Sequence, residues 1–370
     1  MKVKTLGEIC NIVSGGTPTR SKPQFWVDGT IPWIKIGNIK GKYITEADEF
    51  ITQEGLNGSS AKMISKGSVL YTIFATLGEV GILGFDACTN QAIAGITIKD
   101  KEQLSTDYLY YYLKSKKSYV NNIGRGVAQN NINMSILRSF EVPLPDLSKQ
   151  NEITRVVEKV SQIINARKQE ICYLDNLIKA RFVEMFGVYP ANPMGWEIGT
   201  IRDIVTEVRY GSSRPAVDGG KYPYLRMNNI TYGGELDLSD TKRIDIPDNE
   251  LDKCTVRRGD VLFNRTNSKE LVGKTCVYDR DEMMVLAGFV IRIRVKDRIL
   301  PEFLSAFLNT DFSKQMLLGM CKTAIGQANI NAQELQNIGL YLPPVELQRR
   351  FVQFKKETDK SKLMKFIYVA

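Results

Sequence analysis

Polar and basic side chains recur in loops rich in glycine or turn residues in both halves of this 370-residue chain. Arginine fits the edge of guanine, and asparagine or glutamine fits the edge of adenine, because their paired hydrogen-bonding groups match those base faces. Lysines nearby would bind phosphates without reading sequence. For any one residue, a solvated loop is the more ordinary interpretation. The candidate base or phosphate contacts are Thr17, Thr19, Arg20, Lys22, Lys35, Asn38, Arg125, Gln129, Asn130 and Asn133 in the first half, and Arg209, Ser212, Arg214, Arg226, Asn228, Arg265, Asn267, Lys269, Gln327, Asn329 and Asn331 in the second.

Some of these candidates belong to a repeated motif, Gln-x-Asn-Ile-Asn, which occurs at 129–133 and again at 327–331. The repetition favours a shared function for the two places, although a turn that joins two elements explains it equally well. In the second half Arg292, Arg294 and Lys296 alternate along an expected strand. Alternate residues of a strand point to one face, so we expect three cations on one side of a sheet.

Residue types needed for most catalysis are missing or scattered. The chain has no histidine, which removes histidine bases, nucleophile–histidine pairs and histidine-ligated metals. Its six cysteines show no C-x-x-C spacing, so neither a zinc site nor a disulfide framework is expected. A phosphate-binding loop of the form GxxxxGK[ST] is absent from the sequence. We therefore expect no catalytic residue, no metal site and no bound cofactor in this chain.

The chain is moderately basic, with a net charge of +9. This balance is compatible with nucleic-acid binding and equally with a lysine-rich surface. The sequence contains no run of about 18 apolar residues, and residues 1–20 lack the apolar core of a signal peptide. We expect a cytoplasmic protein that neither crosses a membrane nor is exported.

The candidate residues lie in two similar stretches of sequence. Residues 5–9 resemble 200–204, residues 32–39 resemble 223–230, and residues 67–70 resemble 259–262. A period near 195 residues is that of a whole domain with a connector. Each stretch reads as mixed α/β, with strands expected at 31–39, 68–74 and 92–99 in the first and at 222–230, 260–265 and 285–296 in the second. Helices are expected at 107–121, capped by Thr106, and from Pro301 onward.

A long helix is expected between the two stretches, because residues 149–186 contain neither glycine nor proline. At about 1.5 Å per residue it would extend about 57 Å, which favours a spacer over an ordinary domain helix. Its apolar residues repeat at spacings of four and three, which is typical of a helix that packs on another helix. The seam residues expected to dock a partner are Ile153, Val157, Val160, Ile164, Ile171, Leu174 and Ile178.

The order of these features resembles the specificity subunit of type I restriction–modification systems. The motifs that carry the resemblance are the paired Gly-Ser/Asp-Val-Leu segments at 67–70 and 259–262, the two Gln-x-Asn-Ile-Asn turns, and two proline-rich entries into helices, at 143–150 and 342–348. The resemblance covers essentially the whole chain. No single motif is highly specific, but their order and duplication are.

The resemblance implies two α/β target recognition domains, residues 1–148 and 188–344. Between and after them come a central helix, 149–187, and a shorter C-terminal helix, 345–370. The helices would form an antiparallel coiled coil with pseudo-twofold symmetry. The short second helix departs from the family pattern and would fit a truncated or rearranged form.

The resemblance also implies a function without catalysis by this chain. Each domain would read one half of a bipartite, asymmetric site in double-stranded DNA. The helices would set the gap and dock two methyltransferase subunits, which would bring S-adenosylmethionine, and restriction and motor subunits would join. Two other interpretations stay open: a coiled-coil adaptor that binds proteins, and a nuclease with an unrecognised site.

Overall fold

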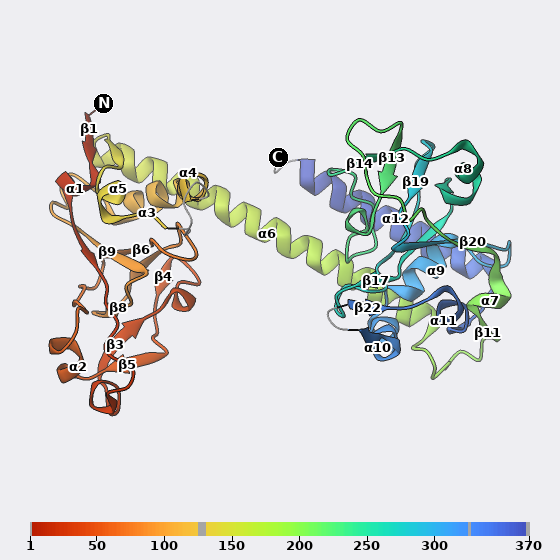
Figure 1. Cartoon of the computed structure of the whole chain (residues 1–370), viewed down its shortest axis with the longest axis horizontal. Coiled ribbons are helices and arrows are strands. Elements are labelled where there is room, and N and C mark those ends of the chain that lie inside the picture. The colour runs from red at the N-terminus through yellow and green to blue at the C-terminus, as the bar shows by residue number, and fades with distance from the viewer. Residues whose placement is uncertain (1, 125–130, 325–326, 368–370) are drawn as a thin grey trace. The chain divides into compact units, whose positions relative to one another are not determined.

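The computed structural model describes residues 2–124, 131–324 and 327–367. The chain divides into two compact units, Met1–Ile164 and Asn165–Ala370, which are described separately below. Figure 1 shows the elements of each unit and the helix α6 (Leu147–Phe186), whose two ends belong to different units.

The first unit is built on two sheets and a pair of terminal strands. A five-stranded sheet has the order β2 (Cys10–Ser14), β9 (Ile93–Ile98), β6 (Val69–Thr72), β7 (Val80–Leu83) and β4 (Tyr43–Ile44). A three-stranded sheet has the order β5 (Glu49–Ile51), β3 (Ile31–Ile34) and β8 (Cys88–Thr89). Strand β1 (Lys2–Thr5) pairs with β10 (Glu141–Leu144). All four residues of β6 are buried, as a central β-branched and aromatic strand requires.

Short helices connect these strands. They are α1 (Leu6–Ile9), η1 (Pro23–Phe25), η2 (Ile36–Asn38), α2 (Gln53–Asn57), α3 (Thr106–Ser115), α4 (Lys117–Gly124) and α5 (Met134–Arg138). The single helix expected at 107–121 is therefore two helices, and its first cap is Ser105, whose Oγ accepts the Tyr108 N–H, rather than Thr106. The strand expected at 31–39 ends at Ile34, because the Asn38 side chain accepts the Lys35 N–H and closes a 3-10 turn.

The second unit repeats the order of the first four strands of the five-stranded sheet and of all three strands of the smaller one. One sheet runs β12 (Val205–Tyr210), β20 (Val290–Val295), β16 (Val261–Asn264), β18 (Thr275–Val277), and another runs β14 (Lys242–Ile244), β13 (Tyr222–Leu225), β19 (Met284–Leu286), β15 (Thr255–Val256). The smaller sheets are β11 (Ile198–Thr200) with β23 (Gly339–Tyr341), and β17 (Thr266–Asn267), β22 (Gln327–Asn329) and β21 (Lys322–Ala324). The helices are α7 (Ile201–Ile204), η3 (Met227–Asn229), α8 (Asp248–Cys254), α9 (Pro301–Leu308), α10 (Asp311–Met320), α11 (Ala332–Gln336) and α12 (Val345–Ile367).

The registers confirm that the repeat in sequence is a repeat in fold. Val69 pairs with Ile96 in the first unit, as Val261 pairs with Ile293 in the second. Strand β3 pairs antiparallel with β5 and parallel with β8, and β13 pairs in the same two senses with β14 and β19. The strand expected at 222–230 ends at Leu225 and gives way to η3, as β3 does to η2. Both units are thus mixed α/β with the same central topology.

Each long helix is attached to its unit by a buried glutamine. The Gln150 side chain accepts the Ser105 N–H (2.9 Å) and donates to the carbonyls of Gln103 and Pro145 (2.8 and 2.9 Å). Gln348 accepts the Leu300 N–H (2.8 Å) and donates to the carbonyls of Arg298 and Pro343 (3.2 and 2.8 Å). Both glutamines are fully buried. The matching Gln positions in the two repeats are therefore structural.

In the second unit α12 packs on the last turns of α6 in the opposite direction. Phe182 and Phe186 contact Phe351, with ring centroids 5.2 and 5.7 Å apart, and Asp175 pairs with Lys362 at 2.5 Å. The contacts move backward along α6 as they move forward along α12, so the two helices are antiparallel there. Gly187 ends α6 in a left-handed conformation (φ 83°), as the sequence predicts.

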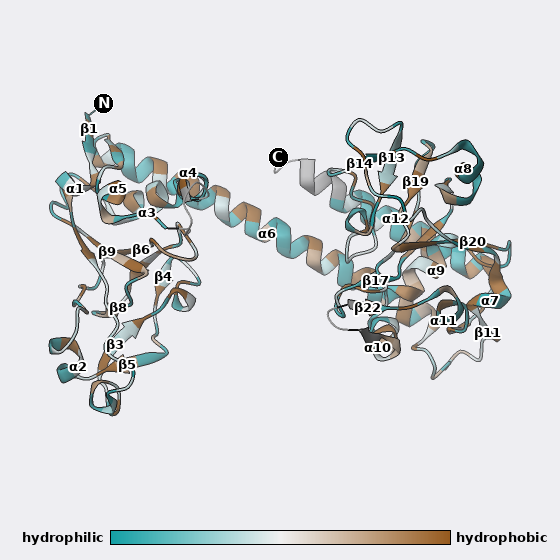
Figure 2. Ribbon diagram, viewed as in Figure 1, coloured by the Kyte–Doolittle hydropathy of each residue, from teal (hydrophilic) through white to brown (hydrophobic). Residues whose placement is uncertain are grey.

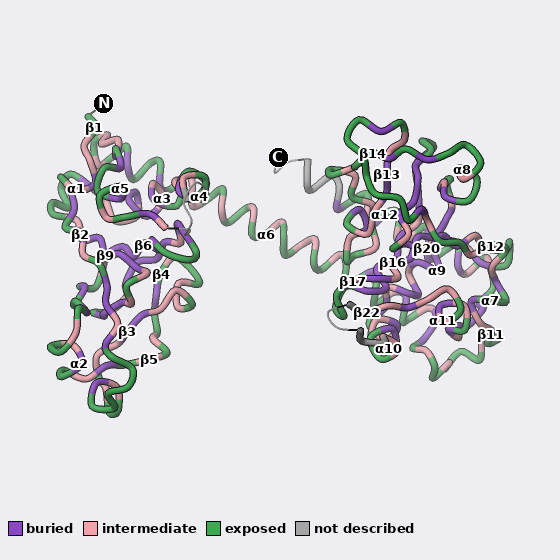
Figure 3. Tube along the Cα trace, viewed as in Figure 1, coloured by how far each residue is buried: buried purple, intermediate pink, exposed green. Residues whose placement is uncertain are grey.

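The expected docking seam of α6 stays a prediction, and its residues differ in burial. Ile178 is buried in the core of the second unit, while Val157, Ile164, Ile171 and Leu174 are half-buried. Ile153 and Val160 are exposed, and in their place Thr154 is buried. The first unit therefore covers Thr154 and leaves Ile153 and Val160 exposed. Figures 2 and 3 show apolar and exposed residues along the middle of α6. No helix among the described residues is long and apolar enough to span a membrane.

Candidate nucleic-acid interface

The glycine-rich loop of the first unit is clamped to the end of its sheet. The N–H groups of Gly15 and Gly16 donate to the carbonyls of Ile93 and Thr89, at 3.1 and 2.8 Å. The Trp33 indole N–H donates to the Gly16 carbonyl at 2.9 Å. A Cβ on Gly15 would lie 2.1 Å from the Asn90 carbonyl oxygen, so only glycine fits this approach. The backbone of the loop is therefore held while its later side chains face outward.

The second unit builds the same clamp from different residues. Gly211 N–H donates to the Val290 carbonyl (3.3 Å), and Ser212 N–H donates to the Leu286 carbonyl (2.7 Å). The Tyr224 hydroxyl takes the place of the indole and donates to the Ser212 carbonyl (3.1 Å). Ser212 itself is buried, and its hydroxyl accepts the Arg214 N–H, so its side chain has a structural role here and its expected contact with a base stays a prediction.

An arginine follows each clamp, and a glutamate holds it. The Arg20 guanidinium lies 3.7 Å from the Trp26 ring centroid and 4.9 Å from that of Trp33, and it pairs with Glu49 at 2.6 Å. Lys35 pairs with the other oxygen of Glu49. Burial acts to raise the pKa of Glu49, but its hydrogen bonds with Lys35 and Arg20 outweigh this and lower it. The result is a charged, stacked platform.

In the second unit Arg214 pairs with Glu250 at 2.7 Å, a contact that lowers the pKa of that glutamate. Arg226, the counterpart of Lys35, pairs with Asp240 at 3.0 Å. Asn228 is exposed, and its neighbour Asn229 is buried and closes the η3 turn by accepting the Arg226 N–H. Asn229 is thus the counterpart of Asn38, whose carbonyl oxygen closes η2, so Asn38 serves the fold and its expected role at a base is not supported.

The remaining side chains of the first loop are arranged around this platform. Thr17 donates to the side-chain oxygen of Gln91, while Lys22 lies 5.0 Å from the Phe25 ring centroid. Thr19 is exposed. These three side chains and Arg20 come from one short stretch next to the β8–β9 turn, so the structure brings the first group of candidates together.

A second loop, after β6 and after β16, lies beside the Gln-x-Asn-Ile-Asn segment in each unit. Phe74 forms a bridge with Asn131, and the Thr266 hydroxyl hydrogen-bonds to the Asn329 side chain at 3.0 Å. In the first unit the bridge is followed by Ala75, a non-glycine residue with a left-handed backbone (φ 60°). Phe74 is exposed, which places an aromatic ring beside the polar segment.

The second loop of the second unit carries more polar side chains. Arg265 lies 4.8 Å from the Tyr210 ring centroid, and its N–H donates to the carbonyl of the exposed Phe289. Asn267 hydrogen-bonds to Asn264 at 3.2 Å, and Lys269 is exposed. These residues form a second basic and aromatic group.

The last asparagine of each repeated turn is a helix cap. Asn133 accepts the Ile136 N–H at the start of α5, and Asn331 accepts the N–H groups of Gln333 and Glu334 at the start of α11. Both asparagines therefore have a structural role as helix caps, and their expected contacts with bases stay a prediction. Arg125, Gln129 and Asn130 lie outside the described residues, and nothing is described of the Gln327 side chain.

The alternating arginines of β20 do not form an open cationic face. Arg292 is buried and pairs with Glu207 at 2.7 Å, and Arg294 pairs with Glu207 and Asp260, both at 2.8 Å. Arg209 pairs with the other oxygen of Glu207 at 2.5 Å. The expectation of three cations on one face did not include these acids, because Glu207 lies on the neighbouring strand β12 and Asp260 lies just before β16.

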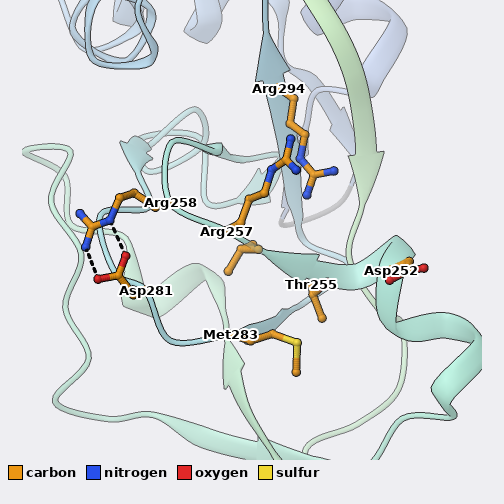
Figure 4. Close-up of a pocket in the computed structure, with 8 residues that line it drawn as sticks. Asp252, Thr255, Arg257, Arg258, Asp281, Met283 and Arg294 are labelled. Carbon is orange, nitrogen blue, oxygen red and sulfur yellow. Dashed lines mark hydrogen bonds and ion pairs between the residues drawn. The ribbon is translucent and has the colours of Figure 1, made fainter.

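A pocket of about 570 Å³ opens beside this network in the second unit. Figure 4 shows Arg257 and Arg294 in it, with Arg258 joined to Asp281 at its edge. Arg257 and Arg258 are not among the residues expected from the sequence, nor are the aromatic partners Trp26, Trp33 and Phe289. The Arg-Arg-Gly turn at 257–259 and the tryptophans next to a basic loop are signals that could have pointed to them. Within the described residues, no group of three or more cysteine, aspartate or glutamate side chains could hold a metal ion.

Comparison with known proteins gives one family for both units. Residues 1–173 and 193–367 each match the family described as Type I restriction modification DNA specificity domain. The MjaIX specificity subunit of Methanocaldococcus jannaschii is 28% identical over 263 residues, or 65% of this chain and 59% of its own length. The EcoKI specificity subunit of Escherichia coli K12 is 22% identical over 353 residues, or 88% of this chain and 75% of its own.

Two solved structures share the fold. A structure reported for complex assembly and conformational transition of the type I R-M system has a TM-score of 0.63 and 18% identity, covering 100% of this chain and 93% of that one. The S subunit from M. genitalium has a TM-score of 0.50 and 13% identity, covering 100% and 91%.

Proposed function

Because the chain belongs to the type I restriction modification DNA specificity family, we propose that its two domains each read one half of a bipartite, asymmetric DNA site. The observation that carries this proposal is the clamped loop, which is built twice on the same framework and presents different side chains each time. Two domains that share a loop framework but carry different side chains on it are suited to two different half-sites. Arginines supply groups that match guanine edges, and the exposed lysines supply phosphate contacts.

We also propose that α6 docks the methyltransferase subunits of a larger complex, two of them in the full assembly. Ile153, Val156, Val160 and Ile163 are 36–54% exposed at spacings of three and four, so they form one apolar stripe on the first unit's part of α6. Such a stripe on a long helix is typical of a surface that packs on another protein. The partners would bind S-adenosylmethionine and catalyse methylation, and this chain would recognise the DNA sequence. Restriction and motor subunits would join that complex.

Mapping methylated adenines in a genome that expresses this chain with its methyltransferase tests the proposal. A split motif with a fixed gap is expected. Exchanging residues 188–344 for those of a relative should change one half of the motif and leave the other half and the gap unchanged. A continuous motif, or a change in both halves, would contradict the two-reader proposal.

A binding measurement separates this function from the two other interpretations. A DNA reader should lose affinity for duplex DNA steeply between about 50 and 200 mM salt, because bound phosphates release counterions. An adaptor that binds only proteins would show no such dependence. A nuclease would show metal-dependent cleavage by the purified chain alone.

A further inference from the structure

The pocket in the second unit is lined by three arginines and two aspartates. It is lined by residues of α8, β15, β20 and two turns: Asp252, Thr255, Val256, Arg257, Arg258, Asp281, Met283 and Arg294. Figure 4 shows the Arg257 side chain running toward Arg294, while Asp252 lies on the opposite side of the pocket.

Most charged groups around this pocket are already paired. Arg258 forms two hydrogen bonds with Asp281, at 2.7 and 3.0 Å. Arg294 is held by Glu207 and Asp260. Among the described residues, no hydrogen bond or ion pair occupies the guanidinium of Arg257, which is exposed. Arg257 is therefore the cation in this cluster with free donors.

The position of Arg257 is fixed although its side chain is free. Its N–H donates to the buried Asp260 carboxylate at 2.9 Å, and its carbonyl accepts the Asp260 N–H at 3.0 Å. The same carboxylate binds Arg294, so one acid sets the spacing of both arginines. Glu207 and Asp260 already offset the charge of Arg294, so the free positive charge in the pocket is that of Arg257. A phosphate suits this group, because its oxygens can accept two parallel N–H bonds from one planar guanidinium.

We propose that this pocket binds a phosphate group of the DNA backbone, with Arg257 as the contacting residue and Arg294 behind it. The proposal rests on the proposed function as a DNA reader. The contact would fix how the second domain sits on the duplex without reading a base.

The first domain does not have this site. The registers align Ile96 with Ile293, so Gly95 and Thr97 occupy the places of Arg292 and Arg294. Gly67 corresponds to Gly259, so Ser65 stands at the position equivalent to Arg257. Thr97 hydrogen-bonds to Ser68, the counterpart of Asp260, at 2.8 Å. A neutral pair thus replaces the charged network, and the phosphate contact would belong to the second half-site alone.

The test compares Arg257→Gln with Arg280→Gln, an exposed arginine of the same domain that does not line the pocket. The full chain with its methyltransferase binds duplex DNA carrying the mapped motif at several salt concentrations. For Arg257→Gln, the slope of log affinity against log salt should become shallower by about 0.9. The ratio of the wild-type affinity for DNA to that of Arg257→Gln should then fall about threefold as the salt rises from about 50 to 200 mM. The methylated motif should not change, and Arg280→Gln should match the wild type.

A second arm distinguishes a backbone phosphate from a free one. Inorganic phosphate is titrated into the chain without DNA at constant ionic strength, and thermal unfolding is followed. Stabilisation lost in Arg257→Gln, with an unchanged DNA slope, would assign the pocket to a free phosphate and overturn the backbone contact. Equal behaviour of both variants in both arms would overturn the site altogether. Absence of salt-dependent DNA binding by the wild type would instead contradict the proposed function, and the phosphate arm would still decide whether the pocket binds an anion.

Discussion

At the scale of single residues, the clamped loops depend on two glycines that have no room for a side chain. A Cβ on Gly211 would lie 2.1 Å from the Leu286 carbonyl oxygen, so Gly211→Ala must shift backbone. We expect a loss of about 1–3 kcal/mol in the free energy of unfolding of the second domain. Gly319→Ala is the matched control, because nothing lies within 4 Å of its added Cβ and it lies in α10. That change should be neutral or stabilise by up to about 1 kcal/mol. Urea unfolding of both variants measures the difference, and equal stabilities would contradict the clamp.

Glu207 makes the free energy of unfolding of the second domain depend on pH. Burial acts to raise its pKa, but the charges of Arg292, Arg294 and Arg209 prevail and lower it below 4.5. The unfolded carboxyl therefore takes up a proton at higher pH than the folded one, so its contribution is complete above about pH 4.5 and is lost as the pH falls through the lower folded value. Glu207→Gln should cost on the order of 3 kcal/mol at pH 7, because the buried Arg292 loses its carboxylate.

The measurement is urea unfolding of the wild type and Glu207→Gln between pH 7 and pH 3. The stability difference between them should narrow once the pH drops below the ordinary carboxyl range. Glu346→Gln, which removes an exposed partner of Arg349, should show a small difference at every pH. A constant difference for Glu207→Gln would mean that the network does not act through its charge.

The candidate contacts show what residue types alone can and cannot reveal. The sequence placed Arg20 and Arg214 correctly beside the loops, because glycine and proline density marks a loop without knowledge of its neighbours. It could not separate Asn133 and Asn331 from base-reading asparagines, since the same amide serves a helix cap and an adenine edge. Only the structure shows which partner already occupies it.

At the scale of elements, the two long helices were foreseen closely. The central one begins at Leu147, two residues before the expected start, and ends at Phe186 as expected, because uninterrupted sequence between proline and glycine leaves few alternatives. Its packing face was less predictable. Apolar residues occur on more than one face of α6, and which face is covered depends on the domain that packs there, as the exposed Ile153 and buried Thr154 show.

The attachment of α12 to its domain depends on Gln348. Gln348→Ala removes three hydrogen bonds in a fully buried place and leaves the Leu300 N–H without its acceptor. We expect a loss of about 2–4 kcal/mol in the free energy of unfolding, since each unsatisfied buried group costs about 1–3 kcal/mol. Gln353→Ala, an exposed change on the same helix, should cost less than about 0.5 kcal/mol. Circular dichroism during urea unfolding reports both, and a mild effect of Gln348→Ala would show that apolar packing alone holds the helix.

At the scale of the whole molecule, the duplication concerns framework more than chemistry. The two units share strand order, register, loop clamp and glutamine attachment. They differ in the side chains beneath the shared framework: Trp33 against Tyr224 under the loop, and a neutral Thr97–Ser68 pair against the Arg294–Asp260 pair. Under the proposed function, a common framework with separate side chains would let the target of one domain change without disturbing the other.

The apolar stripe of α6 gives the last prediction, which concerns assembly. Val160 is 50% exposed in the middle of the stripe, so Val160→Glu should leave the fold intact and place a charge where a methyltransferase is proposed to pack. Burying an unpaired carboxylate in an apolar interface is costly, and we expect at least a tenfold loss of affinity for the methyltransferase, or about 1.4 kcal/mol. Size-exclusion chromatography or calorimetry of the mixed subunits measures it.

The control for this prediction is Val27→Glu, which adds the same charge at an exposed valine outside α6. It should assemble like the wild type. If Val160→Glu also assembles normally while unfolding at the same urea concentration as the wild type, the stripe is not the docking surface. The half-buried face at Ile164, Ile171 and Leu174 would then be the alternative docking surface, since those residues continue the apolar pattern along α6.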